Sequence, residues 1–193
     1  MVQLPRRRFL LKVAGLLPLP FVARRLHSLA TADLDPRLLR ALASAILPTE
    51  LGDAGIDRTV AGFRQWLDGY REGVELLHGY GTGELRTTGP SPALRWAGQL
   101  DTLDAAARKG HNAPFDRLNL AELQALVRNA LQNTRLGSLL QFDRAPHLAL
   151  GLLGYFYTLP EATDLCYRSR IGPNTCRPLS ESGRRPLPLA GNP

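Results

Sequence analysis

Apolar side chains recur at helical spacing along most of the chain after residue 33. The first run lies between Asp35 and Pro48, and its apolar members are Leu38, Leu39, Leu42, Ile46 and Leu47. Asp35 followed by Pro36 is typical of a helix start, because an aspartate accepts hydrogen bonds from free backbone N–H groups and proline fits the first helical position. Pro48 ends the run, so we expect a helix between Asp35 and Pro48.

The sequence predicts a second helix after a turn at Gly52–Gly55, with Asp57 as its cap. Its apolar face comprises Val60, Phe63, Trp66, Leu67 and Tyr70, and Leu76-Leu77 would extend it. Glycines and prolines between Gly79 and Pro92 then predict a loop.

Four more helices are expected beyond this loop. Residues 93–108 place Leu94, Ala97, Leu100, Leu103 and Ala107 inward. Asn119 is placed to cap a helix that reaches Gln132, with Leu120, Leu123, Leu126, Val127 and Leu131 inward. Residues 146–158 are apolar nearly all round, which is typical of a central, buried helix, and a short helix is expected from Pro160 to Cys166.

The sequence shows no sustained alternation of apolar and polar residues and no strand–helix–strand rhythm. It therefore predicts an all-α fold, a small irregular helical bundle of about five helices with long loops. The tail from Arg177 holds four prolines and no periodicity, so we expect an extended, Pro-rich C-terminal tail. The predicted organisation is a signal peptide in residues 1–32, a helical domain in residues 33–176 and the tail in residues 177–193.

Residues 1–32 resemble a twin-arginine export signal. The pattern is carried by Arg6, Arg7, Phe9 and Leu10, which precede an apolar stretch. That stretch is too short, and too interrupted by prolines, to span a bilayer. Ala30-Thr31-Ala32 and Ser28-Leu29-Ala30 offer the small residues that a signal peptidase accepts. The alternative is a basic N-terminal arm without a role in export.

The signal also accounts for most of the positive charge. Six of the 24 lysine and arginine residues lie in residues 1–32, and none of the 17 acidic residues does. Cleavage after Ala32 therefore leaves 18 basic and 17 acidic side chains in the mature chain. A nucleic-acid partner is not expected, because nucleic-acid binding needs a concentrated basic surface.

The chain contains two cysteines, Cys166 and Cys176. In an exported protein, such a pair favours a disulfide that closes a small loop. Gly172-Pro173-Asn174 lies between them and is a turn sequence. The alternatives are two free thiols or part of a metal site.

Motifs for catalysis or for a cofactor are not visible in the sequence. The glycines at 79, 81 and 83 do not follow a predicted strand, as a dinucleotide-binding loop would require. His147 is expected to cap or pack a helix, and Glu50, Asp53 and Asp57 to cap helix ends. The absence of such motifs favours a chain without catalysis of its own. The alternative is a self-sufficient enzyme or a ligand-binding module, with a site near the Gly79–Pro92 loop that includes His78 and Glu84.

Tyr155, Phe156 and Tyr157 are consecutive on a predicted helix. Consecutive helical positions point in different directions, so the three side chains cannot all face one core. At least one should face solvent or a partner, so Tyr155, Phe156 and Tyr157 are candidates for contact with a partner chain. The alternative is that these aromatic residues belong to the core.

Several of these segments, in this order, resemble the gluconate 2-dehydrogenase subunit 3 family. They are the export signal, Ile46-Leu47-Pro48-Thr49, the segment from Gly52 to Asp57, and the segment from Gly154 to Glu161. Members of this family are small subunits of membrane-bound, FAD-dependent sugar and polyol dehydrogenases.

The resemblance implies a non-catalytic chain without catalytic, cofactor-binding or metal-binding residues of its own. FAD would be bound by a large subunit that resembles the glucose-methanol-choline oxidoreductases, and haem c by a cytochrome subunit. The small subunit would escort the folded large subunit through the twin-arginine translocase. The complex would then lie in the periplasm, at the outer face of the inner membrane.

Overall fold

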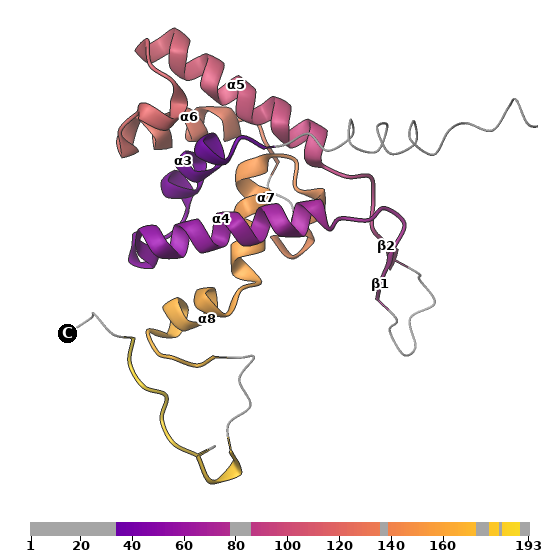
Figure 1. Ribbon diagram of the computed structural model, residues 1–193, viewed down its shortest axis with the longest axis vertical. Coiled ribbons are helices and arrows are strands. Elements are labelled where there is room, and N and C mark those ends of the chain that lie inside the picture. The colour runs from indigo at the N-terminus through magenta and orange to yellow at the C-terminus, as the bar shows by residue number, and fades with distance from the viewer. Residues whose placement is uncertain (1–33, 78–85, 136–138, 173–177, 182, 190–193) are drawn as a thin grey trace, which may run out of the picture. The chain divides into compact units, whose positions relative to one another are not determined.

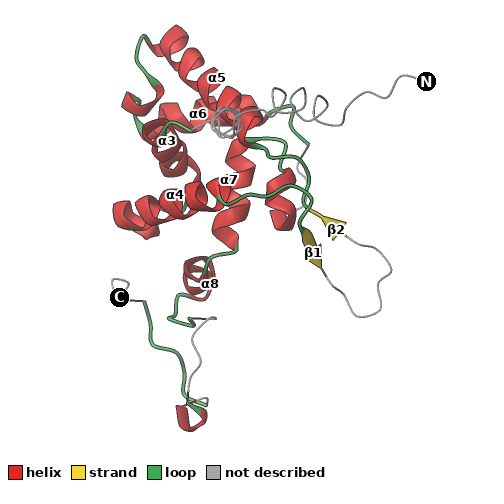
Figure 2. Ribbon diagram, turned by 45° about the vertical axis from the view of Figure 1, so that its right-hand side comes forward, coloured by secondary structure: helices red, strands yellow, loops and turns green. Residues whose placement is uncertain are grey.

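The computed structural model describes residues 34–77, 86–135, 139–172, 178–181 and 183–189 (Figure 1). All of them belong to one compact unit, Asp33–Pro193, which is described here by itself. The predicted export signal, the glycine loop with His78 and Glu84, and Cys176 lie outside the described residues. Within the described part the helices are α3 to α8, which confirms the all-α prediction (Figure 2).

Helix α3 (Pro36–Ile46) begins where the sequence predicts. The Asp35 carboxylate accepts hydrogen bonds from the backbone N–H groups of Arg37 and Leu38, at 2.8 and 3.4 Å. These bonds satisfy donors that have no partner within the helix. The face of α3 that carries Leu39 and Leu42 is fully buried.

The predicted turn at Gly52–Gly55 is wrong. A short 3-10 helix, η1 (Thr49–Leu51), leads directly into α4 (Gly52–Asp68). The change of direction needs only Gly52, whose φ of 60° is a conformation that glycine adopts readily. Asp57 therefore lies inside α4 and does not cap it.

The expected extension of this helix through Leu76-Leu77 is also wrong. Helix α4 ends at Asp68, and Glu75–Leu77 forms strand β1, which pairs antiparallel with β2 (Arg86–Thr87). Thr88 supports this short ladder, since its hydroxyl donates to the Arg71 carbonyl at 2.6 Å and accepts from the Val74 N–H at 2.8 Å.

Helix α5 (Ala93–His111) is longer than predicted and ends at Asn112 in the left-handed conformation. The 3-10 helix η2 (Phe115–Arg117) connects it to α6 (Leu120–Leu131). Asn119 caps α6 as predicted, and Glu122 completes a reciprocal capping box. Leu94 and Leu120 were expected to face inward but are 68% and 44% exposed. Both lie in the first turn of their helix, at the edge of the packed region.

Helix α7 (Leu148–Tyr157) is the central element, as its apolar sequence predicts. It contacts α3, α4, α5, α8 and the 3-10 segment η3 (Leu139–Arg144) that precedes it. Helix α8 (Pro160–Tyr167) follows after a short connection. Figure 1 shows α7 among the surrounding helices and α8 beyond its C-terminal end.

The core contains a cluster of aromatic rings. Phe63 and Trp96 are fully buried and stack with ring centroids 5.5 Å apart. Trp66 lies 5.6 Å from Phe63 and 4.8 Å from Phe142, so rings from α4, α5 and η3 meet in this cluster. Their burial contributes much of the hydrophobic stabilisation of the fold.

Candidate functional site

The aromatic trio at the end of α7 is divided between core and surface. Phe156 is 1% exposed, Tyr155 is partly buried and Tyr157 is 53% exposed. Tyr155 belongs to the aromatic cluster, with its ring centroid 5.4 Å from that of Phe63. Burial raises the pKa of the Tyr155 phenol, and the nearby Glu161 carboxylate raises it further. The Phe156 side chain is therefore not accessible to a partner, and Tyr157 is the most exposed residue of the trio.

Further large apolar side chains are exposed in the C-terminal part of the chain. Tyr167 at the end of α8 is 69% exposed, Leu179 is 93% exposed and Leu187 is 69% exposed. Single exposed apolar residues are common on soluble proteins. Their recurrence after Tyr157 makes this part of the chain a candidate partner-binding region.

The segment after α8 is attached to the described part of the tail. One carboxylate oxygen of Asp164 accepts hydrogen bonds from the N–H groups of Ile171 and Gly172, at 2.8 and 3.0 Å. The Arg170 N–H donates to the Leu187 carbonyl at 2.7 Å, next to a bridge between Ser169 and Pro188. The end of α8 therefore anchors residues close to the C-terminus.

The predicted disulfide remains a prediction. Cys166 is exposed on α8 and is not bonded to any residue that the structure describes. Its expected partner, Cys176, lies outside that part of the chain.

His147 has the capping role that the sequence predicts. It is buried at the start of α7, where its Nδ1 accepts a hydrogen bond from the Ala149 N–H at 3.1 Å. Burial lowers the pKa of its imidazole. Since Nδ1 must be unprotonated to accept this bond, a structural role accounts for the residue.

An ion-pair cluster that the sequence did not predict lies between α3 and α4. The Arg40 guanidinium donates to Asp53 at 2.8 Å and to Asp57 at 2.6 Å. The hydrogen bond to Asp57, and after it the bond to Asp53, raises the pKa of Arg40. The spacing of Asp53 and Asp57, four residues apart, places them on one face of a helix and was the available signal.

A groove adjoins this cluster at α3, and Arg40 belongs to both. The volume of the groove is about 490 Å³. Polar and charged residues line part of it, namely Arg37, Arg40, Ser44, Asp116 and Arg117. Apolar residues line the rest, namely Ala41, Leu118, Leu120 and Leu123.

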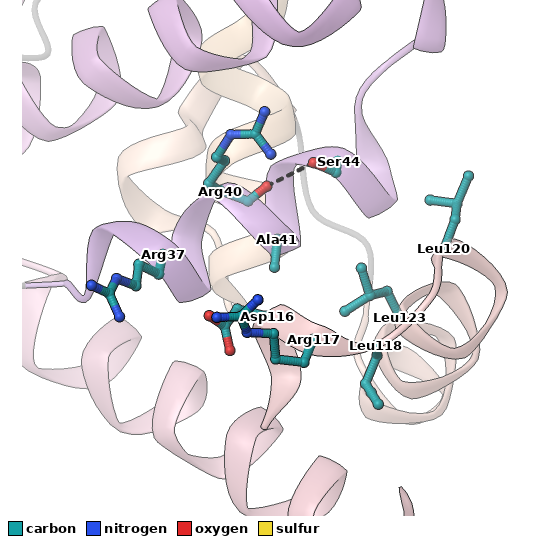
Figure 3. A pocket seen from close by; sticks show the side chains of 9 residues that line it. All are labelled: Arg37, Arg40, Ala41, Ser44, Asp116, Arg117, Leu118, Leu120 and Leu123. Atoms are coloured by element: carbon teal, nitrogen blue, oxygen red, sulfur yellow. Dashed lines mark hydrogen bonds between the residues drawn. The ribbon is translucent and has the colours of Figure 1, made fainter. Parts of the chain in front are cut away.

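Figure 3 shows the two parts of the groove separately. Arg37, Asp116 and Arg117 lie toward one side, and Leu118, Leu120 and Leu123 gather at the other. Helix α3, the 3-10 helix η2 and the start of α6 each contribute lining residues. The groove therefore suits a ligand that carries both negative charge and apolar surface.

No group of three or more His, Cys, Asp and Glu side chains in the described residues is arranged to hold a metal ion. No helix among those residues combines the length and hydropathy needed to cross a bilayer.

The structure thus defines a small all-α protein with a charged groove and exposed aromatic side chains near its C-terminus. Comparisons with known protein families, with curated proteins and with solved structures found no match.

Proposed function

We propose that this chain is the non-catalytic small subunit of a periplasmic, FAD-dependent sugar or polyol dehydrogenase. In this role it carries the twin-arginine signal and escorts the folded flavoprotein large subunit across the membrane. It then stabilises that subunit in the assembled complex, from which a c-type cytochrome subunit passes electrons onward. The chain provides the export address and a binding surface, and FAD in the large subunit provides the redox chemistry.

The observation that carries this proposal is the resemblance described above, which begins with the signal around Arg6 and Arg7. Its other segments fall on neighbouring parts of the fold. Two of them, Ile46–Thr49 and Gly52–Asp57, lie at the end of α3, in η1 and at the start of α4. The third, Gly154–Glu161, covers the end of α7 and the start of α8. Helix α7 contacts both α3 and α4, so these segments belong to one packed unit.

The exposed side chains give physical support to a binding role. Tyr157 and Tyr167 each place a large aromatic ring in solvent, at the ends of two consecutive helices. Tyrosine is enriched at protein interfaces, because its ring supplies contact area and its hydroxyl supplies a hydrogen bond. A partner that covered these rings would bury apolar surface that is now in contact with water.

The first test is purification of the tagged chain from its native host, followed by an absorption spectrum of what accompanies it. We expect a second, larger chain to accompany it, and the spectrum to show flavin absorption bands at about 380 and 450 nm, as is typical of the bound cofactor. A colourless chain that purifies alone and stays monomeric when co-expressed with the flavoprotein would contradict the proposal.

The second test addresses the escort role. Replacing Arg6 and Arg7 by lysine should leave both this chain and the flavoprotein in the cytoplasm, because the arginine pair is the recognised address. Replacing Arg24 and Arg25 by lysine is a matched control, since it changes a second arginine pair of the same region outside the pattern. Full export of the flavoprotein with the first variant would show that its export does not depend on this signal.

A further inference from the structure

The arginines of the groove on α3 differ in their partners. Arg40 forms ion pairs with Asp53 and Asp57 of α4. Arg37 and Arg117 are exposed, and neither side chain forms an ion pair or hydrogen bond with another residue that the structure describes. The groove therefore presents two guanidinium groups that are unpaired within the part of the chain that the structure describes.

Asp116 is the carboxylate among the residues that line the groove. Arg40 is compensated by its two aspartates, which do not line the groove, but Arg37 and Arg117 still outnumber Asp116 among the lining residues, so the exposed charge of the lining is positive. A guanidinium group pairs well with a carboxylate, because its N–H donors match the two carboxylate oxygens. The charge of the groove thus complements an acidic ligand.

The other side of the groove is aliphatic. Leu120 is 44% exposed there, beside the partly exposed Leu118 and the buried Leu123. A simple inorganic anion would leave these leucines in water. A peptide segment with a carboxylate and neighbouring apolar side chains would use both sides.

We propose that this groove binds an acidic, apolar segment of the flavoprotein large subunit. The carboxylates of that segment would pair with Arg37 and Arg117, and its apolar side chains would cover Leu120. This inference rests on the proposed function for the identity of the partner, and on the charge and shape of the groove for the kind of segment bound.

The test compares two forms of the purified mature chain, the wild type and the double variant Arg37→Glu/Arg117→Glu. For each form, the affinity for the flavoprotein is measured. Reversing both charges places like charges opposite the segment, and we expect the complex to weaken at least about tenfold. The affinity of the wild-type complex should also fall as salt is added, because exposed charges are screened. Glutamate at residue 37 lies in the first turn of α3, where it is compatible with the helix dipole.

The variant Leu120→Glu tests the aliphatic side and should weaken the complex to a similar extent. Two exposed residues elsewhere provide matched controls, Arg58→Glu on α4 and Leu94→Glu in the first turn of α5. Both controls should change the affinity less than about twofold, because surface substitutions away from an interface have small effects. Circular dichroism and melting temperature verify that each variant is folded.

The possible results separate the two proposals. If the wild-type chain does not bind the flavoprotein, the proposed function is wrong. If it binds and the groove variants bind equally well, the groove inference is wrong and the proposed function stands. A groove that takes only a small anion would show a melting temperature raised by inorganic phosphate in the wild type but not in the double variant, with unchanged affinity for the flavoprotein. That result would also overturn the inference.

Discussion

Gly151 lies in α7 directly against the Trp96 indole. A Cβ atom at this position would lie 2.6 Å from Cζ2 and 2.9 Å from Cη2 of that ring. Trp96 is fully buried, so the ring has little space into which to move. The close approach of α7 to α5 therefore requires a residue without a side chain.

We expect Gly151→Ala to lower the free energy of unfolding by about 1 to 3 kcal/mol, because it overpacks the core. Urea unfolding measures this change. Gly98→Ala is the control, since Gly98 lies within α5 and a Cβ there meets no atom within 4 Å. That variant should raise stability by up to about 1 kcal/mol through helix propensity. Equal effects of the two substitutions would show that the contact with Trp96 is unimportant.

Asp104 connects α5 to the segment that follows it. Its carboxylate accepts a hydrogen bond from the Phe115 N–H at 2.9 Å and another from Arg108 Nε at 2.7 Å. The bond from Phe115 is the main reason that the pKa of Asp104 is lowered. The carboxylate therefore stabilises the fold in its charged form.

Because the folded pKa is lowered, this stabilisation is fully present above the usual aspartate pKa of about 3.9. It is lost as the pH falls through the lower folded value. We expect Asp104→Asn to be less stable than wild type by about 1.5 to 3 kcal/mol at pH 7, the range for hydrogen bonds to charged groups. The difference should shrink in acid. Thermal unfolding at several pH values measures it, and a difference that persists unchanged in acid would exclude the charge as its cause.

Individual capping residues were predictable because a cap involves neighbours in sequence. Asp35, Asn119 and His147 bond to N–H groups two or three residues ahead, and each was placed correctly. The bonds from Arg40 to Asp53 and Asp57 span 13 and 17 residues and cross between helices. Such a pairing depends on how helices pack, which local sequence signals do not specify.

Helix α7 starts at a buried histidine whose protonation state matters. His147 accepts the Ala149 N–H bond through Nδ1, so protonation of that nitrogen removes the cap. Its lowered pKa means that the unfolded chain binds this proton more readily than the folded one. The histidine therefore favours unfolding as the pH falls below its unfolded pKa of about 6.5.

We expect the variant His147→Asn to retain the cap, because asparagine is a good capping residue that does not titrate. Its stability should depend less on pH between about 6.5 and 5 than that of wild type. Chemical unfolding across this range provides the measurement. If both proteins lose stability equally, the acid sensitivity originates elsewhere in the chain.

The positions of helices were more predictable than their ends. Apolar periodicity located α3 to α6, and the nearly all-round apolar composition of residues 146–158 located α7 and predicted its central place. The short helix α8 was expected after Pro160. The start of α4 was misplaced because glycines at 52 and 55 resemble a turn, whereas only Gly52 has a positive φ. Strand β1 was missed because it is short and pairs with β2, a strand of two residues further along the chain, so neither gives a sustained local pattern.

The packed core is complete before the tail begins. Its buried apolar residues extend from Leu34 to Ala162, whereas the described tail residues are mostly exposed. Deleting residues 177–193, which leaves Cys176 in place, should therefore shift the melting temperature by less than about 2 °C, which corresponds to a fraction of a kcal/mol. Differential scanning calorimetry measures this shift. Loss of cooperative unfolding would show instead that the tail is part of the folding unit.

The groove was not predictable, although every residue that forms it was visible in the sequence. Its lining comes from α3, η2 and α6, so Arg37 and Leu123 line the same groove only after the chain has folded. The class of fold, by contrast, follows from periodicity that is visible within windows of about 11 to 18 residues in the helical segments. Local patterns thus define the scaffold, and distant pairings define its surfaces.

The two tryptophans of this chain, Trp66 and Trp96, both belong to the aromatic cluster, with ring centroids 6.2 Å apart. Excitation at about 295 nm selects indole over phenol, so the fluorescence it produces reports on this one region of the core. The protein carries its own optical label, and its intrinsic emission follows the opening of the core without any attached dye.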